Sequence, residues 1–393
     1  MAILAVNAGS SSLKFSIHPL QNGQAQRSVL TGSIEGLEPA GEPVLGWTFQ
    51  GRQRSRHLSA TATDPFDHAL QNLGELLVED AAIPQIKAIA HRVVHGGRDF
   101  SASVRITAEV LRQLERLISL APLHQPQNLQ GIHAFQRAFP STPQIACFDT
   151  AFHATLSELD YSFALPQALV EQGVRRYGFH GLSYQYVMSQ LVQRSEQAMG
   201  RVLMAHLGNG ASLCAALGGR SRATSMGFST LDGLVMGTRC GSLDPGVLLY
   251  LLEQGWGHAQ LQNLFYKESG LLGVSGISAD MRRLRSDASA AAQRAIDLFT
   301  HRVVHESGAM IADIGGLDIL AFSGGIGEHD SVLRAQVCDR LSWLGIALDP
   351  LLNQLATGSE ALAIHQPDSR VQVWVIPTDE GLVAAQEAAR LIS

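Results

Sequence analysis

The strongest constraint on the fold of this 393-residue chain is a strand–turn–strand design that occurs twice. Residues 3–6 form an apolar run, residues 7–12 make a polar turn rich in serine, and residues 13–17 alternate between apolar and polar side chains. The same arrangement returns at residues 202–217, where residues 206–210 make the turn. Alternation with a period of two predicts strands, and two such hairpins half a chain apart predict a duplicated domain.

Strands and helices alternate along the rest of the chain. Apolar strand patterns at residues 86–94 and 317–322 each run into a glycine pair, and a long helical pattern covers residues 288–313. This alternation predicts an α/β fold with buried sheets. No low-complexity linker divides the chain, so we expect the two domains to meet at a compact hinge near Thr150.

Composition excludes several classes of protein. Hydrophobic residues make up 46% of the chain, which excludes a disordered protein. The net charge of −6 argues against a protein that binds nucleic acid by neutralising phosphates. We find neither an apolar run long enough to span a bilayer nor the basic start of a signal peptide. Four scattered cysteines without a Cys-x-x-Cys pair fit a reducing compartment, so we expect a cytoplasmic protein that binds neither nucleic acid nor membranes.

Three glycine-containing turns are candidates for phosphate binding, at residues 7–12, 208–210 and 324–328. Backbone N–H groups in such turns form concave sets of donors that suit phosphate oxygens. The chain has no Gly-Lys pair for a Walker A loop, and Leu213 replaces the third glycine of a dinucleotide-binding motif. Each turn alone is more simply a structural turn, whereas the three together favour phosphate binding.

Four charged or titratable residues outside these turns are candidates for chemistry. Arg92 ends a strand before two glycines, and Asp149 follows a short apolar strand, where α/β sheets present active groups. A carboxylate there can hold Mg²⁺ or orient a nucleophile, His180 can donate to a phosphoryl group, and Arg239 lies in pliable, glycine-rich backbone. Each residue also fits a structural role: a surface ion pair for either arginine, a cap for Asp149, and a packed position for His180.

A zinc hydrolase built on the histidines is disfavoured. His301 and His305 are four residues apart on the long helical pattern and are followed by Glu306. The order is not His-Glu-x-x-His, however, and no third ligand is spaced nearby. Metal analysis of the purified protein tests whether the histidines bind zinc.

Ten short stretches carry a resemblance to a known family. They are NAGSSSLKF, AHRVVHGG, APLHQPQNL, FDTAFH, RRYGFHGLS, HLGNGAS, MGTRCG, DMR, SGGIGE and TDEG. They run from Asn7 to Glu380, and together they resemble the acetokinase family over essentially the whole chain. The resemblance implies duplicated ribonuclease-H-like domains of the actin-like ATPase fold around a central cleft. These domains would span residues 1–150 and 151–381, with the last helix, about 382–393, packing against the first.

The resemblance also implies a reaction and its participants. The reaction would be reversible transfer of the ATP γ-phosphoryl group to acetate, giving acetyl phosphate and ADP. The metal would be Mg²⁺, with Mn²⁺ as an alternative, and the protein would form a homodimer. Arg92, Asp149, His180 and Arg239 match the family's catalytic positions, with Arg92 also gripping the substrate carboxylate.

The remaining roles implied by the resemblance cover three sets of residues. The metal would bind Asn7 and Glu380. The acyl methyl group would contact Val94, Leu123 and Phe179. The nucleotide would contact Lys14, His206, Leu207, Gly208, Asn209, Gly210, Asp280, Met281, Arg282, Gly324, Gly325, Ile326, Gly327 and Glu328.

The chain departs from the family pattern at four positions. Cys240 and Ser242 stand where the family has Ser and Asp, which removes a possible partner for Arg239. Gly381 replaces a second glutamate, and Thr230 replaces a proline next to the acyl pocket. Thr230 leaves the acyl chain length open, so a kinase for propionate or another short-chain carboxylate is the alternative. An ATP-switched binding module, like actin and its heat-shock relatives, would not explain three cationic side chains aimed at one cleft.

Overall fold

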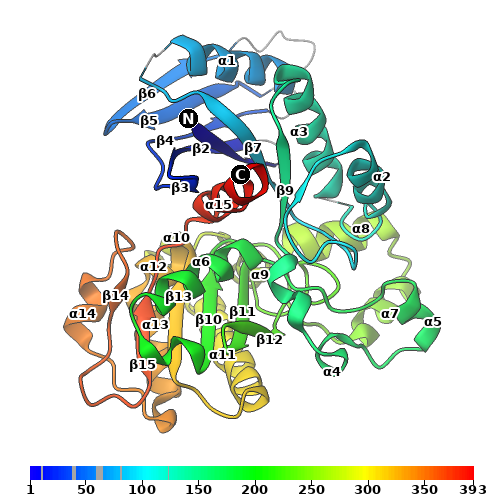
Figure 1. The fold of residues 1–393 in the computed structure, drawn as a ribbon. Helices are drawn as coiled ribbons and strands as arrows, with labels where there is room; N and C mark the ends of the chain where they lie inside the picture. Colours follow the sequence, from blue (N-terminus) through cyan, green and yellow to red (C-terminus); the bar gives the residue numbers. More distant parts are fainter. Residues whose placement is uncertain (10–11, 38–40, 59–64, 80–81, 123) are drawn as a thin grey trace. The chain divides into compact units, whose positions relative to one another are not determined.

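The computed structural model describes residues 1–9, 12–37, 41–58, 65–79, 82–122 and 124–393 (Figure 1). These residues divide into two compact units, one of Met1–Ala151 with Asp379–Ser393 and the other of Phe152–Thr378. Each unit carries one sheet and a set of helices, so the predicted α/β fold class is confirmed. Residues 379–381, which the sequence assigned to the second domain, lie in the first unit.

The first unit is built on the first predicted hairpin. Its strands are β1 Ala2–Ala8, β2 Ser12–Gln21, β3 Gln24–Ala25, β4 Leu30–Glu35, β5 Val44–Phe49, β6 Arg52–His57, β7 Ile86–Val93, β8 Val104–Arg105 and β9 Gln144–Phe148. They form a sheet of order β6-β5-β4-β2-β1-β7-β9-β8, with β3 paired to β2. β1 and β2 are antiparallel, and Asn7 lies opposite Lys14. Because β1, β7 and β9 are parallel, their carboxyl ends share one edge of the sheet.

The second unit repeats this topology. Its strands are β10 Arg201–Leu207, β11 Ala211–Leu217, β12 Arg220–Thr224, β13 Ile319–Ser323, β14 Leu362–Ala363 and β15 Gln372–Val375. Their order, β12-β11-β10-β13-β15-β14, and their directions match β4-β2-β1-β7-β9-β8 strand for strand. The duplication predicted from the two hairpins is therefore confirmed at the level of topology.

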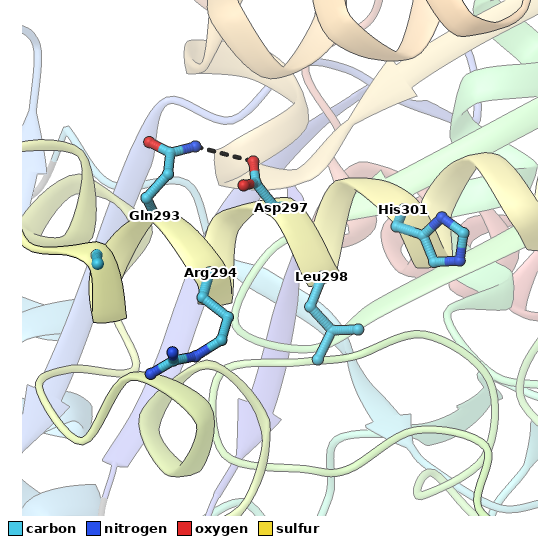
Figure 2. Close-up of a pocket in the computed structure, with 6 residues that line it drawn as sticks. Gln293, Arg294, Asp297, Leu298 and His301 are labelled. Carbon is cyan, nitrogen blue, oxygen red and sulfur yellow. Dashed lines mark hydrogen bonds between the residues drawn. The ribbon is translucent and has the colours of Figure 1, made fainter.

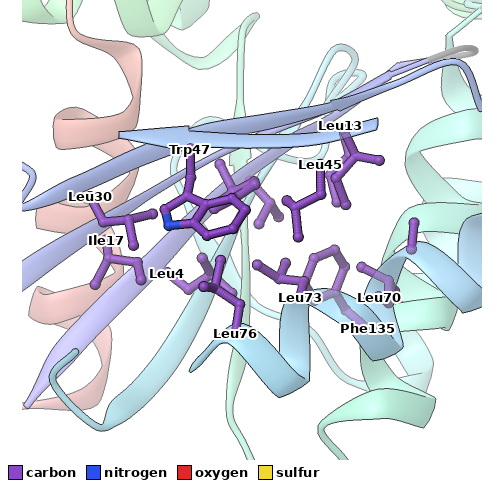
Figure 3. Packing of buried hydrophobic residues seen from close by; sticks show 14 of the residues in the cluster. Leu4, Leu13, Ile17, Leu30, Leu45, Trp47, Leu70, Leu73, Leu76 and Phe135 are labelled. Atoms are coloured by element: carbon purple, nitrogen blue, oxygen red, sulfur yellow. The ribbon is translucent and has the colours of Figure 1, made fainter. Parts of the chain in front are cut away.

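Helices pack against the first sheet. They are α1 Pro65–Glu79, α2 Ala108–Arg116, α3 Gln125–Ala138 and α15 Glu380–Ile392. Alternate residues of β1, such as Leu4, pack with Leu73 of α1 and Phe135 of α3 in one buried cluster, which Figure 3 shows from close by. Ile3 and Ala5 are buried but outside this cluster, and α15 packs on β1, β7 and β9. A strand whose alternate residues are buried on both faces is typical of a sheet covered by helices on both sides.

The helices of the second unit surround its own sheet. They are α4 Glu158–Tyr161, α5 Gln167–Glu171, α6 Gly181–Val192, α7 Pro245–Glu253, α8 His258–Asn263, α9 Gly270–Ser275, α10 Met281–Arg285, α11 Ala290–Asp313, α12 Gly324–His329, α13 Ser331–Arg340 and α14 Pro350–Leu355. The long predicted helix is α11, which packs on β10, β11 and β12. It begins after Ser289, whose hydroxyl accepts from the N–H of Ala292.

One local prediction is wrong. Residues 324–328 were expected to form a turn, and they form most of the short helix α12. Gly324 makes the change of direction alone, with φ of 74°, and a β-carbon there would lie 2.7 Å from the carbonyl oxygen of Leu207. Because only glycine fits that approach, the chain passes from β13 into a helix without a longer turn. In the described ranges, no helix has both the length and the apolar character needed to cross a membrane.

Candidate functional site

Three charged side chains meet at the carboxyl edge of the first sheet. Arg92 is the penultimate residue of β7, and Asp149 directly follows β9, the parallel neighbour of β7. Arg92 donates from Nε to Oδ1 of Asp149 at 2.9 Å and from Nη2 to Oδ2 at 2.6 Å. Its Nε also lies 3.5 Å from Oε2 of Glu380, the first residue of α15. Two parallel hydrogen bonds to one carboxylate fix the plane of the guanidinium.

The charge of Arg92 is compensated twice. Burial lowers the pKa of Arg92, but the carboxylates of Asp149 and Glu380 more than reverse this effect, so the pKa is raised overall. When all three groups are ionised, the cluster carries one negative charge in excess. Such a cluster suits a cation at this edge of the sheet.

The oxygen donors of this cluster fit Mg²⁺. Asp149 and Glu380 supply carboxylates, and Asn7 adds an amide in β1 at the level of Arg92. Mg²⁺ usually binds one or two protein carboxylates and completes its shell with water and substrate phosphates. Within the part of the chain that the structure describes, no group of three His, Cys, Asp or Glu residues is placed so that it could hold a metal ion. The donor set therefore fits a metal shared with phosphate oxygens better than a metal enclosed by the protein.

In the second unit, Arg239 and His180 meet at Gly210. A β-carbon placed on Gly210 would lie 2.7 Å from Nη2 of Arg239 and 3.4 Å from Nε2 of His180. The absence of a side chain at Gly210 thus lets two nitrogen donors approach the same point of the backbone. Arg239 is fixed from its other side, where Nη1 donates to the carbonyl oxygen of Thr230 at 2.7 Å. This arrangement can hold an anionic group against both donors.

Arg239 differs from Arg92 in its electrostatics. Burial lowers the pKa of Arg239, and among the described residues no carboxylate forms an ion pair with it. Ser242, where the family pattern has Asp, donates instead to Oδ1 of Asp232 at 2.8 Å. The positive charge of Arg239 is therefore available to an anion. Cys240 next to it is half-buried, and burial raises the pKa of its thiol, so its position does not favour a thiolate.

His180 has an unusual backbone and a well-defined ring. Its φ of 58° and ψ of 23° lie in the left-handed region, directly before α6. Side chains other than glycine adopt that region at a cost of about 1–2 kcal/mol. The Nδ1 atom lies 2.9 Å from Oγ of Ser212, and the ring stacks on that of His206 with centroids 4.3 Å apart. The ring is thus fixed at one nitrogen and on one face.

His153 supports the segment that precedes His180. Its Nε2 donates to the carbonyl oxygen of Phe179 at 2.9 Å, and its Nδ1 lies 2.9 Å from Oγ of Ser221. Burial lowers the pKa of His153 to about 4. This histidine is therefore neutral near pH 7 and has a structural role.

Several loops of the second unit come together beside these donors. A β-carbon on Gly237 would lie 2.0 Å from Oδ1 of Asn209 and 3.2 Å from the carbonyl oxygen of Ala279. One placed on Gly208 would lie 3.9 Å from the amide nitrogen of Gly325. The segments that the sequence assigned to the nucleotide, 206–210, 280–282 and 324–328, are thus close neighbours. Their contact with a nucleotide stays a prediction.

Side chains within these segments stabilise the loops themselves. Asp280 accepts from the backbone N–H of Arg282 at 2.8 Å and pairs with its guanidinium, while Met281 is buried. Oε1 of Glu328 accepts from the backbone N–H groups of Gly324 at 2.8 Å and Thr378 at 3.1 Å, and burial raises the pKa of its carboxyl. Leu207 is buried at the end of β10, and Gly325, Ile326 and Gly327 belong to α12.

Two predicted groupings stay predictions. Val94 lies in the first unit and Phe179 in the second, while Leu123 lies outside the described residues, so the acyl pocket is not tested. Arg92 likewise belongs to one unit, and His180 and Arg239 to the other. Their convergence on one phosphorus atom therefore also stays a prediction.

Two supporting residues were missed by sequence reasoning. Oδ1 of Asn128 in α3 accepts from the N–H of Val94 at 2.9 Å, and its Nδ2 donates to the carbonyl oxygen of Ala8 at 3.2 Å. It thereby joins the ends of β1 and β7, which carry Asn7 and Arg92. Ser212 orients the His180 ring through the contact of its Oγ with Nδ1. Both lie within the quoted stretches, but their partners are far away in the sequence, so spacing alone gives no sign of the role.

A surface hollow lies apart from all of these residues. Its lining residues come from α11 alone and are Ala290, Gln293, Arg294, Asp297, Leu298 and His301 (Figure 2). Gln293 donates to Asp297 at 2.8 Å, and Nδ1 of His301 lies 3.1 Å from Nη2 of Arg340. None of the residues predicted to bind substrate, metal or nucleotide lines it, so the candidate site lies elsewhere.

The sheets and the residues at their edges define a protein of the actin-like ATPase fold class, as two solved structures show. A propionate kinase from Francisella tularensis subsp. tularensis superposes with a TM-score of 0.90 at 37% identity, covering 98% of each chain. An acetate kinase from Porphyromonas gingivalis superposes with a TM-score of 0.89 at 35% identity, covering all of both chains. The predicted fold class is confirmed.

A sequence model of the acetokinase family matches residues 2–386, and this chain belongs to that family. An acetate kinase from Rhodopseudomonas palustris (strain ATCC BAA-98 / CGA009) is 48% identical over 397 residues, which cover 99% of this chain and 98% of the relative. An acetate kinase from Nitrobacter hamburgensis is 43% identical, covering 100% of this chain and 96% of the relative. The family predicted from the ten stretches is confirmed.

Proposed function

We propose that this protein transfers the γ-phosphoryl group of ATP reversibly to acetate, forming acetyl phosphate and ADP. The relatives that match over the full length and are named acetate kinases support this reaction. The observation that carries the proposal is the pair of donors at Gly210. Arg239 there has no carboxylate to compensate it in the described part of the chain, and Nε2 of His180 lies against the same glycine.

Phosphoryl transfer needs groups that position the reactants and neutralise the phosphoryl oxygens more than it needs covalent chemistry. Arg239 supplies a fixed positive charge, and His180 supplies an N–H donor from a ring whose other nitrogen is already bound. Both donors are oriented before the substrate arrives, so they do not have to reorganise during the reaction. We assign transition-state stabilisation to these two residues and to Arg92.

The cluster of the first unit would bind the carboxylate substrate and the metal. Asp149 engages Nε and Nη2 of Arg92, which leaves Nη1 to donate to acetate. Glu380 and Asn7, with Asp149 close by, would hold Mg²⁺ or Mn²⁺. When bound, such an ion neutralises charge on the phosphate oxygens. Asp149 would therefore orient Arg92 and lie beside the metal.

The experiment measures acetyl phosphate as its hydroxamate, with ATP, Mg²⁺ and acetate in the presence of hydroxylamine. We expect the wild-type protein to form hydroxamate and Arg239→Ala to lower kcat by about 10²–10³-fold. The exposed Arg222 of the same unit provides a control, because Arg222→Ala removes the same charge outside the site. A wild-type protein that forms no hydroxamate, or an Arg239→Ala variant at full rate, would refute the proposal.

A second candidate substrate is propionate. The propionate kinase from Francisella tularensis matches this fold closely, and Thr230 stands where the family pattern has proline. The carbonyl oxygen of Thr230 also accepts a hydrogen bond from Arg239, so the residue at position 230 affects the placement of that guanidinium. We expect acetate to be preferred, since one methylene in an apolar pocket is worth about 1–3 kcal/mol in kcat/KM. A higher kcat/KM for propionate than for acetate would reverse the assignment.

We also propose a homodimer that uses the exposed face of α7. No residue of this helix is buried, although it carries the apolar side chains of Leu248, Leu249 and Tyr250, of which Leu249 is 60% exposed. An apolar helix face left open to water is typical of an interaction surface. We expect Leu249→Asp to convert a dimer into a monomer in light scattering, while Leu159→Asp, at an exposed leucine of α4, leaves the mass unchanged. A monomeric wild-type protein would contradict this assignment.

The cysteines support a location in the cytoplasm. Cys147, Cys214 and Cys338 are buried free thiols, and Cys240 is a half-buried one. Free thiols persist in reducing compartments. Cell fractionation of the native host tests this assignment, and recovery outside the cytoplasm would contradict it.

A further inference from the structure

A chain of hydrogen bonds reaches the His180 ring from the interior of the second unit. Ser212 lies in β11 opposite His206 of β10 and is fully buried. Its Oγ lies 2.9 Å from Nδ1 of His180 and also contacts the hydroxyl of Tyr184, a buried residue of α6.

The direction of these hydrogen bonds follows from the protons available. A phenol is a stronger hydrogen-bond donor than an aliphatic hydroxyl, so Tyr184 donates its proton to Oγ of Ser212. Burial raises the pKa of Tyr184 well above its usual value, so the phenol keeps that proton. Ser212 has a single proton to donate, and Nδ1 of His180 lies within reach to accept it.

We propose that Tyr184 and Ser212 are positioning residues that hold the neutral His180 ring in the tautomer with its proton on Nε2. The hydrogen bond at one imidazole nitrogen decides which nitrogen carries the proton. The Nε2 edge is the one that lies against Gly210 beside Arg239. A neutral His180 therefore presents an N–H donor to an anion, with no need for a second positive charge beside the guanidinium. This inference deepens the proposed function and rests on it.

The groups that face the His180 ring come from several elements. Among the residues that the structure describes, His206 of β10 stacks on the ring, and Arg239 lies near its Nε2 edge, against Gly210. The hydroxyl of Tyr184 of α6 contacts the serine hydroxyl that lies at Nδ1 of His180. Of these neighbours, only His206 is another imidazole, so it is the group that the control must address.

A neighbouring serine provides that matched control. Oγ of Ser183, also fully buried, lies 2.8 Å from Nδ1 of His206. Ser183→Ala therefore removes a buried serine–imidazole hydrogen bond of the same kind without changing the one at His180. Its effect on rate and stability measures what such a loss costs in general.

The first experiment measures the pH dependence of Ser212→Ala. Without the serine donor, the neutral ring of His180 populates both tautomers, and part of the enzyme lacks the Nε2 proton. Near pH 8 we expect kcat to fall by about 10–10²-fold, with KM values within about threefold of the wild type. At a pH low enough to protonate His180, the imidazolium carries both protons, so the ratio to the wild type should recover, whereas Ser183→Ala should show no such recovery. An unchanged rate, or a loss of equal size at both pH values, would overturn the proposal.

The second experiment tests whether Tyr184 acts through Ser212. Tyr184→Phe keeps the ring in place, removes one donor, and serves as the alternative variant if Ser212→Ala does not fold. We expect it to lower kcat alone, by less than Ser212→Ala, and to add no more than about twofold in the Ser212→Ala background. Fully additive losses would mean independent structural effects and would overturn the proposal.

The third experiment observes the tautomer without any assay of activity. The ¹⁵N resonances of the His180 ring are assigned by their loss in His180→Gln. In the wild-type protein we expect an unprotonated Nδ1 and a protonated Nε2, with both tautomers present in Ser212→Ala. A proton on Nδ1 of the neutral wild-type ring would overturn the proposal. This result is independent of hydroxamate formation, so the tautomer and the proposed function can fail separately.

Discussion

Replacing Gly210 by alanine tests the geometry of the second unit with one methyl group. The backbone of Gly210 lies outside the left-handed region, so alanine can adopt it without strain. The new methyl group would stand 2.7 Å from Nη2 of Arg239 and 3.4 Å from Nε2 of His180. The substitution removes no hydrogen bond and no charge, so any effect comes from displaced donors.

The expected size of the effect follows from these distances. An ordinary contact needs about 3.5 Å, so the end of Arg239 has to move by about 0.8 Å. A misplacement of about 1 Å in a reactive geometry costs about 10²-fold in rate. The guanidinium is the end of a flexible side chain, and a glycine-to-alanine change at a permissive position stabilises by about 0.4–1 kcal/mol through the unfolded state. We therefore expect kcat to fall by about 10²-fold with the melting temperature nearly unchanged.

The hydroxamate assay and thermal unfolding of Gly210→Ala measure both quantities. Gly308 in α11 supplies the control, because a β-carbon there has no neighbour within 4 Å. Gly308→Ala should leave kcat unchanged. If Gly210→Ala keeps kcat within about threefold of the wild type, the placement of these two donors against Gly210 does not matter for the reaction.

Three further predictions concern charge and stability. Arg92→Lys keeps the charge but cannot make both hydrogen bonds to Asp149. We therefore expect kcat/KM for acetate to be about 10²-fold lower in the hydroxamate assay. A value near that of the wild type would contradict the orientation of Arg92 by Asp149. Burial lowers the pKa of His91, His95 and His153 from 6.5 to about 4. The unfolded chain therefore takes up protons before the folded chain as the pH falls below 6.5. In urea titrations, the free energy of unfolding should fall between pH 6.5 and pH 4 by up to about 3 kcal/mol per histidine. A free energy that does not change with pH would contradict this prediction. Arg334 is fully buried, and its described hydrogen bonds go to carbonyl and amide oxygens. Arg334→Met should therefore lower the free energy of unfolding in urea by at least about 3 kcal/mol. A loss under about 1 kcal/mol would contradict its structural role.

The elements that the sequence predicted well are those with a strong local pattern. The hairpin strands appear at residues 2–8, 12–21, 201–207 and 211–217, and the long helix begins within two residues of its predicted start. Period-two alternation and a capped helical pattern are encoded in neighbouring residues, so no tertiary information is needed. Residues 324–328 were misread because one glycine, Gly324, makes the whole turn.

The site was only partly predictable for the opposite reason. Arg92 and Asp149 could be placed at strand ends, but whether they pair depends on β7 and β9 being neighbours, which the sequence does not show. Asn128 bonds across 120 residues, and Ser212 is a buried serine with no pattern of its own. Family resemblance supplied the names of the residues, while the hydrogen bonds that orient them appear only in the folded chain.

The left-handed backbone of His180 has a consequence for engineering this protein. Glycine accepts that conformation freely, and asparagine does so more readily than histidine. A thermostability campaign that ranks variants by melting temperature alone would therefore select glycine at this position and report an improvement. Such an optimised protein would have lost the imidazole to which we assign stabilisation of the phosphoryl group, and only a turnover measurement in the same screen would reveal the loss.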